Sequence, residues 1–339
     1  MSHSGVEAKP PWRTVPRGVR RAAEELLGTE VRRALRVWGG YSPTPTYRLR
    51  LADGRGAFFK AVGPVSNDFA RGAHAREERT YRELSDLIAP WAPTFRGAFR
   101  WDAWHVLLLD DLGPKSVPPW TSALARGVSR ALGDFHRSTL GAAFPSWLPP
   151  PEQQFLRLAP LWERVSESGG LRVLADRAGD QATDALRWLD LAVPVLSGAS
   201  RGLADAGPPY AFLHGDVRSD NLRWSKGRLY LFDWPHVRVG PAEYDAAAFG
   251  QSVATEGGPG PDQIMAWYSE RAPVRPAVLD AAIAAFAGFL ADQAWQPDIP
   301  GLPRLRPFQR RQLRVTLMWA ARRLRLPRPT WLNSVREER

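Results

Sequence analysis

Cysteine is absent from the 339-residue chain, which excludes disulfides, zinc sites built on thiolates and cysteine nucleophiles. Long apolar stretches are lacking as well. The longest nearly apolar run, AAIAAFAGFLA at 281–291, is too short to cross a bilayer as a helix. The first residues, MSHSGVEAKPPWR, contain no apolar segment of the kind found in secretory signals. We therefore expect a cytoplasmic protein with no membrane partner.

Acidic side chains are fewer than basic ones, 35 against 46, which gives a net charge of +11. Much of the excess lies in residues 304–339, which carry 11 basic and 2 acidic side chains, whereas residues 151–303 carry 13 and 19. This distribution argues against a nucleic-acid partner and favours a basic helix with a solvated face. An apolar stripe in this segment predicts packing on the rest of the protein: Leu313, Leu317, Ala321 and Leu324. The alternative is nucleic-acid binding through RRQLRVTLMWAARRLRLPRPTW, which predicts salt-dependent binding.

The length suggests two lobes. TYRLRL at 46–51 alternates apolar and polar residues, and LADGRGAFFKAV at 51–62 indicates two strands joined by an Asp-Gly turn. A helix is predicted over 69–89, followed by two more strands within 94–113, and the pattern beyond is mainly helical. We therefore expect an α+β fold. We expect the chain to divide into an N-terminal nucleotide-binding lobe at 1–110, in which 1–30 are an extension, and a C-terminal catalytic and substrate-binding lobe at 111–339.

Three elements in a fixed order carry groups suited to phosphate chemistry. Lys60 stands on a strand, and Glu77 on the helix that follows can pair with it. The stretch FLHGDVRSDNLRW contains Asp216 and Asn221, and Asp233 ends a later strand. Phosphoryl transfer needs a cation for the nucleotide phosphates, oxygen ligands for magnesium and a carboxylate that accepts the proton of the attacking hydroxyl.

The roles follow from these needs. Lys60 would neutralise the phosphates, Asn221 and Asp233 would hold Mg²⁺, and Asp216 would act as the base. Glu78 and Glu83 lie on the same helix and are competing partners for Lys60. No G-x-x-x-x-G-K-[ST] phosphate loop is present, which removes the commonest alternative phosphate cradle.

These motifs resemble those of the aminoglycoside phosphotransferase and choline kinase family, over roughly residues 35 to 300. The similarity rests on HGDVRSDN, LYLFDW, FFKAV, REERTYREL and VLLLDDLG. It implies a protein-kinase-like fold with two lobes and the use of ATP or GTP with Mg²⁺. It also implies that Glu77, through which REERTYREL aligns best, is the partner of Lys60. The backbone from Leu109 through Asp110 to Asp111 would bind the base, His214 would brace the catalytic loop and Asp245 would fasten it.

The nucleotide loop departs from G-x-G-x-x-G. Pro43 and Pro45 cannot donate backbone hydrogen bonds, so phosphate contacts there would come from residues such as Ser42 and Thr44. After Asp233 there is no Phe-Gly; Trp234 and Pro235 follow, which argues against a flipping switch.

The resemblance places the acceptor site in the C-terminal lobe, after Asp233. Candidate substrate residues are Trp234, Glu243, Asp262, Glu270, Asp292 and Trp295. The acidic character of that lobe favours a cationic or neutral acceptor over an anionic one. We expect a small-molecule kinase that acts on an aminoglycoside-like antibiotic or a related hydroxylated metabolite. A kinase of a choline-like, macrolide or sugar alcohol and a non-catalytic nucleotide-binding module are the alternatives, and the oligomeric state stays open.

Overall fold

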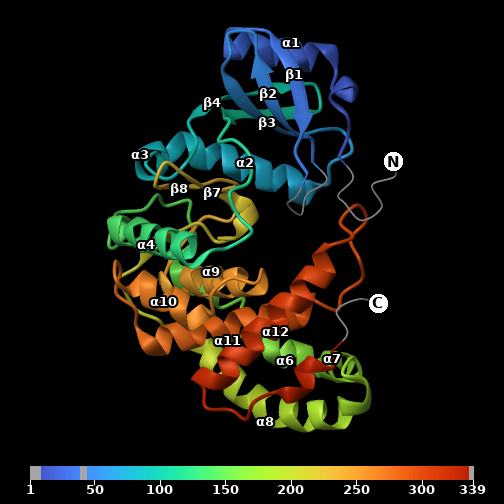
Figure 1. Cartoon of the computed structure of the whole chain (residues 1–339), viewed down its shortest axis with the longest axis vertical. Helices are drawn as coiled ribbons and strands as arrows, with labels where there is room; N and C mark the ends of the chain where they lie inside the picture. The colour runs from blue at the N-terminus through green and yellow to red at the C-terminus, as the bar shows by residue number, and fades with distance from the viewer. Residues whose placement is uncertain (1–8, 39–43, 336–339) are drawn as a thin grey trace. The chain divides into compact units, whose positions relative to one another are not determined.

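The computed structural model describes residues 9–38 and 44–335. They form two compact units. The N-terminal unit contains residues up to 117 with 220–236 and 299–304, and the C-terminal unit contains 118–219, 237–298 and 305 onward. The first has an antiparallel sheet and the second is mainly helical, as the α+β prediction requires (Figure 1). Residues 220–236, which the sequence-based division gave to the C-terminal lobe, group with the N-terminal unit.

The N-terminal unit is built on a five-stranded antiparallel sheet of order β1-β2-β3-β5-β4. Its strands are β1 (Val31–Arg36), β2 (Thr46–Leu51), β3 (Gly56–Val62), β4 (Phe95–Trp101) and β5 (Trp104–Asp110). Its helices are the short 3-10 helix η1 (Trp12–Thr14), α1 (Arg17–Leu27), α2 (Asp68–Glu83) and α3 (Ser85–Ile88). The single helix predicted over 69–89 is therefore two helices. Phe69, the first residue of the predicted helix, is 70% exposed.

Alternation along β2 and β3 gives the sheet two different faces. Tyr47, Leu49, Phe59 and Ala61 are buried in one core with the apolar residues of α1. The intervening side chains project from the opposite face, where α2 lies (Figure 1). The N-terminal extension thus covers one face of the sheet and leaves the other for chemistry.

The hairpin of β7 (Leu222–Ser225) and β8 (Arg228–Leu231) completes this unit. Its turn uses Lys226 and Gly227, both at positive φ, the conformation that two-residue hairpin turns require. Leu231 N donates to Trp91 O at 2.6 Å, which fixes the hairpin beside the end of α3. Asn221, just before β7, and Asp233, just after β8, are thereby positioned from one rigid element.

The C-terminal unit surrounds the apolar helix α11. Its helices are α4 (Ser122–Thr139), α5 (Pro151–Phe155), α6 (Leu161–Glu167), α7 (Gly170–Asp176), η2 (Gly179–Gln181), α8 (Ala182–Arg201), α9 (Glu243–Thr255), α10 (Pro261–Ser269), α11 (Pro276–Gln293), α12 (Leu305–Arg323) and η4 (Thr330–Asn333). The strands β6 (Ala211–Leu213) and β9 (Arg238–Gly240) pair antiparallel, and the short η3 (Ser219–Asn221) lies where the chain passes between units.

Within the described ranges, α11 alone is long and apolar enough to span a membrane by composition. Of its 18-residue window, 56% is buried inside the protein. It contacts α6, α8, α9 and α12, as the core helix of a helical unit does.

The basic helix α12 packs on α11 and α9, as its apolar stripe predicts. Leu313 and Leu317 are fully buried. Several of its arginines are engaged inside the unit: Arg310 Nε donates to Ala294 O at 3.1 Å, and Arg323 pairs with Asp280. Part of the positive charge of this segment therefore serves internal contacts, which weighs against the nucleic-acid alternative.

Candidate active site

Lys60 is the centre of a buried ion-pair cluster in the N-terminal unit. Its Nζ lies 2.6 Å from Glu77 Oε2 on α2 and 2.6 Å from Asp233 Oδ1 beyond β8. The Glu77 side chain is 1% exposed and that of Lys60 15%, whereas that of Asp233 is 38% exposed. The pairing that REERTYREL predicts for Glu77 is present. Glu78 instead bonds His105 and Arg82, and Glu83 bonds Arg79.

Burial and charge oppose each other in this cluster. Burial alone would lower the pKa of Lys60, but the charges of Asp233 and Glu77 raise it above its ordinary value, so the ammonium stays protonated. Burial raises the pKa of Glu77 to about 7, although the Lys60 ammonium acts in the opposite direction. Glu77 is therefore poised to exchange a proton near neutral pH.

A pocket opens on the α2 side of the sheet, and the cluster forms one end of it. The space between its lining atoms is about 860 Å³ when the solvent at its open side is included. The pocket is lined by the alternate residues of β2 and β3 that do not pack in the core with α1: Thr46, Arg48, Phe58 and Lys60. Asn221 and Asp233 also line it. The pocket therefore gathers the predicted lysine, glutamate, amide and metal-aspartate residues.

The other end of the pocket contains the predicted hinge. Leu109, Asp110 and Asp111 all line it. Asp111 accepts from Arg48 Nε at 2.8 and 3.0 Å, and Asp110 pairs with Arg96 at 2.6 Å. These ion pairs fix the carboxylates of the segment that would face the base.

Arg223 occupies this end too, although the sequence gave no reason to single it out. Its guanidinium lies 4.9 Å from the centre of the Phe232 ring and bonds the carbonyl oxygen of Leu222 at 2.8 Å. Burial, and then the charge of Arg48, lower its pKa to about 10. A flat, donor-rich cation in this place can stack on or hydrogen-bond a heteroaromatic base.

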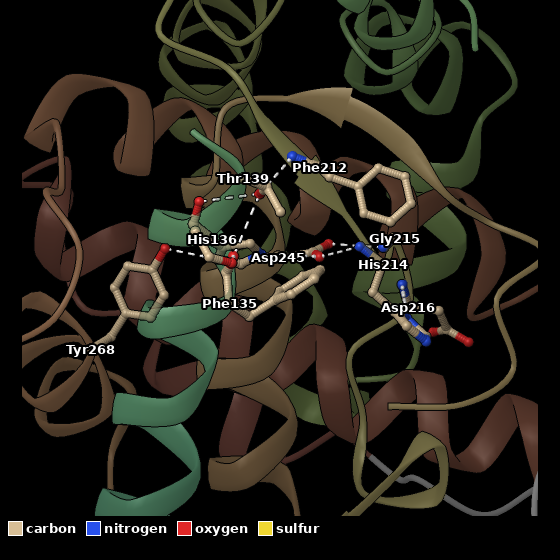
Figure 2. A network of polar contacts seen from close by, with 10 residues as sticks. Phe135, His136, Thr139, Phe212, His214, Gly215, Asp216, Asp245 and Tyr268 are labelled. Atoms are coloured by element: carbon tan, nitrogen blue, oxygen red, sulfur yellow. Dashed lines mark hydrogen bonds and ion pairs between the residues drawn. The ribbon is translucent and has the colours of Figure 1, made fainter. Parts of the chain in front are cut away.

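The catalytic-loop motif of the C-terminal unit is held by a buried carboxylate (Figure 2). Asp245, on α9, accepts from His214 N at 2.7 Å and from Gly215 N at 3.0 Å. His136 Nε2 lies 3.4 Å from the same carboxylate and Nδ1 lies 2.8 Å from Tyr268 Oη. Burial by itself would raise the pKa of Asp245, but contacts with His136 and His214 hold it below its ordinary value. An ionised aspartate thus fixes the backbone just before Asp216.

Two more contacts shape this loop. Gly215 has φ 81°, a left-handed conformation that glycine adopts without strain, and Asp216 N donates to His214 Nδ1 at 3.3 Å. Ser219 Oγ bonds Glu256 Oε1 at 2.5 Å, and Trp120 Nε1 bonds the other oxygen of Glu256 at 2.8 Å. The loop is therefore braced on both sides of Asp216 by carboxylates from α9 and its C-terminal end.

Asp216 is partly exposed, and Arg218 lies 3.4 Å from its Oδ2. The guanidinium of Arg218 thus lies beside the carboxylate that is predicted to accept the hydroxyl proton. Arg218 was not among the predicted site residues. The only feature of the sequence that could have indicated Arg218 is its position two residues after Asp216.

Asn221 and Asp233 offer amide and carboxylate oxygens to one pocket. Asp233 has φ 67°, a left-handed conformation that aspartate tolerates better than most residues. In the described part of the chain, no group of three or more His, Cys, Asp or Glu side chains forms a metal site by itself. Two hard oxygen donors that line one pocket fit Mg²⁺, whose coordination is commonly completed by phosphates and water.

The four acidic residues among the predicted substrate residues pair with side chains of the protein itself. Glu243 pairs with Arg275 at 3.0 Å, Glu270 with Arg126 and Arg130 at 3.2 Å, and Asp292 with Arg164 at 2.8 Å. Asp262 accepts from Trp319 Nε1 at 2.7 Å and pairs with Arg322. Arginines therefore neutralise these four carboxylates, and the acidic surface inferred from charge counts is weaker than the counts suggested.

The two candidate tryptophans are packing residues by their contacts. Trp234 is fully buried, and its Nε1 donates to Leu231 O at 3.0 Å. Arg310 lies 4.8 Å and Arg177 5.2 Å from the centre of the Trp295 ring. The Trp234 ring is therefore enclosed, and arginines already lie against the Trp295 ring.

Of the predicted nucleotide-loop residues, Ser42 lies outside the described residues. Thr44 is buried and lines the pocket. The lining also includes Lys9, Lys115 and Asp220, which no motif had marked.

Fold and site define a kinase-like phosphotransferase. Residues 33–276 match the phosphotransferase enzyme family, most of the chain, so the chain belongs to this family. It is a small-molecule kinase with a hydroxyl acceptor, and its fold is protein-kinase-like. No curated protein matches the sequence.

Solved structures agree with the fold. Spectinomycin phosphotransferase, crystallised with ADP and spectinomycin, is 14% identical, with 93% of this chain and 97% of that chain covered and a TM-score of 0.58. Amicoumacin kinase, crystallised with AMP-PNP and Ca²⁺, is 15% identical, with coverages of 89% and 94% and a TM-score of 0.53. Choline kinase LicA from Streptococcus pneumoniae is 15% identical, with coverages of 88% and 97% and a TM-score of 0.51. Identities this low establish the shared fold only.

Proposed function

We propose that the protein transfers the γ-phosphate of ATP or GTP, with Mg²⁺, to a hydroxyl of an aminoglycoside-like antibiotic or a related hydroxylated metabolite in the cytoplasm. The observation that carries the proposal is the single pocket lined by Lys60, Glu77, Asn221 and Asp233. A lysine held by a glutamate, beside an amide and a second carboxylate, is the set of groups that nucleotide phosphates and a divalent cation require. Spectinomycin, amicoumacin and choline kinases share the fold, and their names support a small hydroxylated acceptor.

Each residue has a defined task in this reaction. Asp216 accepts the proton of the acceptor hydroxyl, whose oxygen forms a bond to the γ-phosphorus while the bond to the bridging oxygen breaks. Lys60, held by Glu77, binds the phosphates, and Asn221 and Asp233 supply oxygens for the cation. Bound Mg²⁺ would neutralise developing charge on the phosphate oxygens. Asp245 and Glu256 keep the loop around Asp216 in one conformation.

The acceptor class rests on the family rather than on the predicted substrate residues. Because arginines neutralise Glu243, Asp262, Glu270 and Asp292, charge selection by those residues is a weak argument for a polycation. Neutral hydroxylated antibiotics, sugars and amino alcohols therefore belong in the same screen as aminoglycosides.

The test is nucleotide turnover with a panel of acceptors. The wild-type protein, ATP or GTP and Mg²⁺ are incubated with aminoglycosides, spectinomycin-like and macrolide antibiotics, choline and ketosamines, and the phosphorylated product is detected by mass spectrometry. The Asp216→Asn variant is expected to lose about 10²–10⁴-fold in turnover while its nucleotide affinity stays within about twofold. The exposed Asp184→Asn variant is the matched control. Nucleotide binding with no product from any acceptor would favour a non-catalytic module, and near-wild-type turnover by Asp216→Asn would refute the base assignment.

A further inference from the structure

Lysine is rare in this chain, and most of its lysines line one pocket. Of its 46 basic residues only four are lysines, at 9, 60, 115 and 226, and the rest are arginines. Three of the four, Lys9, Lys60 and Lys115, line the one pocket described above. Both basic side chains bind phosphate, lysine as a compact point charge with three rotatable donors and arginine as a planar fork of donors. The concentration of lysine in this pocket therefore points to an anionic ligand with more than one lysine contact.

Lys9 reaches the pocket because the segment before α1 is fastened to the sheet. The carbonyl oxygen of Lys9 accepts from Arg36 Nη1 at 3.3 Å, and that of Pro10 accepts from Tyr47 Oη at 2.7 Å. The Trp12 ring then packs edge-on against Tyr47 at 5.0 Å and Phe59 at 5.1 Å. Successive contacts thus fix the backbone that carries Lys9.

The side chain of Lys9 lies at the Lys60 end of the pocket. Lys9 is 8% exposed, and its Nζ donates to Thr46 Oγ1 at 2.6 Å. Thr46 on β2 is directly opposite Lys60 on β3. Side chains of directly opposite residues lie on one face of a sheet, with Cβ atoms about 5 Å apart. The next opposite pair on that face, Arg48 and Phe58, leads toward Asp111 and the hinge end.

The charges at this end require another cation. Lys60 is matched by two carboxylates, Glu77 and Asp233, so with both ionised the three groups carry no net positive charge. A divalent cation bound to Asp233 would supply part of the positive charge that the phosphates need. Pro45, immediately before β2, has no backbone N–H that could donate to a phosphate. Lys9 supplies the missing positive charge from a segment outside the family match, which begins at residue 33.

We propose that Lys9 is a nucleotide-binding residue that contacts the phosphates of the bound nucleoside triphosphate. This inference rests on the proposed function and adds a binding residue to it. The competing explanation is that the bond from Lys9 to Thr46 only tethers the N-terminal segment. The two explanations differ in what the charge does, because a tether affects folding and all ligands equally, whereas a phosphate contact affects only phosphorylated ligands.

The experiment compares Lys9→Met with two matched variants. Lys226→Met removes the fourth lysine, which does not line the pocket, and Tyr47→Phe removes the tether to Pro10 without changing charge. Affinities for adenosine, ADP and ATP, and for guanosine, GDP and GTP, are measured by calorimetry without an acceptor, and the unfolding temperature of each variant is recorded.

We expect Lys9→Met to weaken binding of the di- and triphosphates about tenfold while nucleoside binding changes less than about twofold, since a charge-assisted contact is lost only where phosphate is present. Lys9→Arg should retain part of the affinity, and Lys226→Met should bind all six ligands like the wild type. Tyr47→Phe, which loosens the segment that carries Lys9, should lower the unfolding temperature and should weaken binding of the phosphorylated ligands less than Lys9→Met does. Equal weakening for nucleosides and nucleotides, or no weakening at all, would overturn the role of Lys9. A wild-type protein that binds no nucleotide would instead overturn the proposed function itself.

Discussion

Lys60 and Asp233, 173 positions apart in the chain, are joined by a 2.6 Å ion pair, and Glu77 binds the same ammonium from α2. The strand, the helix and the segment after β8 thus converge on one cation. The arrangement makes the ionisation of each group depend on the others, and four predictions follow from it and from the elements that support it.

The first prediction concerns Glu77 and pH. Because burial raises the pKa of Glu77 to about 7, lowering the pH from 8 to 6 should protonate it and release its hold on Lys60. We expect nucleotide affinity to fall about tenfold over this range, and the Glu77→Gln variant to show weak affinity that no longer depends on pH in this window.

The contribution of Glu77 to folding stability changes with pH in the opposite direction to its effect on nucleotide affinity. The folded pKa of Glu77 lies above its unfolded value, so the stabilising contribution of protonated Glu77 is fully present below about pH 4.5 and is lost as the pH rises through about 7. Nucleotide titrations and urea unfolding at pH 6, 7 and 8 measure both trends. The exposed Glu83→Gln variant serves as control. A wild-type affinity that is flat from pH 6 to 8 would contradict the assignment.

Asp245 gives the second prediction. It is fully buried and ionised, and two backbone N–H groups donate to it, so Asp245→Asn should destabilise the C-terminal unit by about 3–5 kcal/mol at pH 7. Its folded pKa is depressed, so its contribution is present above the unfolded value near 3.8 and is lost as the pH falls through the folded pKa.

The difference between wild type and Asp245→Asn should therefore shrink below about pH 4. Chemical unfolding from pH 7 down to pH 3 would measure it. The Asp134→Asn variant, which removes partly exposed pairings with Arg137 and Arg271, should cost less than about 1 kcal/mol. A penalty for Asp245→Asn that stays constant down to pH 3 would show that its charge is not what stabilises the loop.

Much of this site could be predicted from sequence because the relevant signals are local. Strand alternation around Lys60 and the spacing from Asp216 to Asn221 identify side chains by their neighbours in the chain. The predicted fold class and family were confirmed for the same reason, since the strands, the helices and the motifs occur in an order that few other folds share.

What could not be predicted depends on contacts between distant residues. Nothing near Lys9 indicates that a proline-rich segment returns to β2, because that path is set by Tyr47 and Trp12. Likewise, Glu243 looks like a solvated acid until Arg275, 32 positions later, folds against it. Charge counts add residues without their partners, and so the acidic lobe seemed more open to a cationic substrate than its ion pairs allow.

Adjacent phenylalanines provide the third prediction. Phe59 is fully buried in the α1 core, whereas Phe58 lines the pocket on the opposite face of β3. Phe59→Ala should cost about 3–5 kcal/mol of folding free energy. Phe58→Ala should cost much less and should instead weaken nucleotide binding. Thermal unfolding and nucleotide titration of both variants would separate the two faces, and a reversal of the two effects would show that the assignment of faces is wrong.

The fourth prediction concerns the divalent cation. Asp233→Asn keeps the shape of the side chain but removes one charge from Lys60 and from the proposed metal site. We expect the Mg²⁺-dependent gain in ATP affinity to be lost, because an amide is a weaker ligand for a hard cation than a carboxylate. Affinity without Mg²⁺ should be unchanged or improved, since Lys60 then has one competing carboxylate fewer. Titrations of ATP with and without Mg²⁺ would measure both, with the surface variant Asp53→Asn as control. If Asp233→Asn keeps the full Mg²⁺ effect, the cation is held by other groups and the metal site must be reassigned.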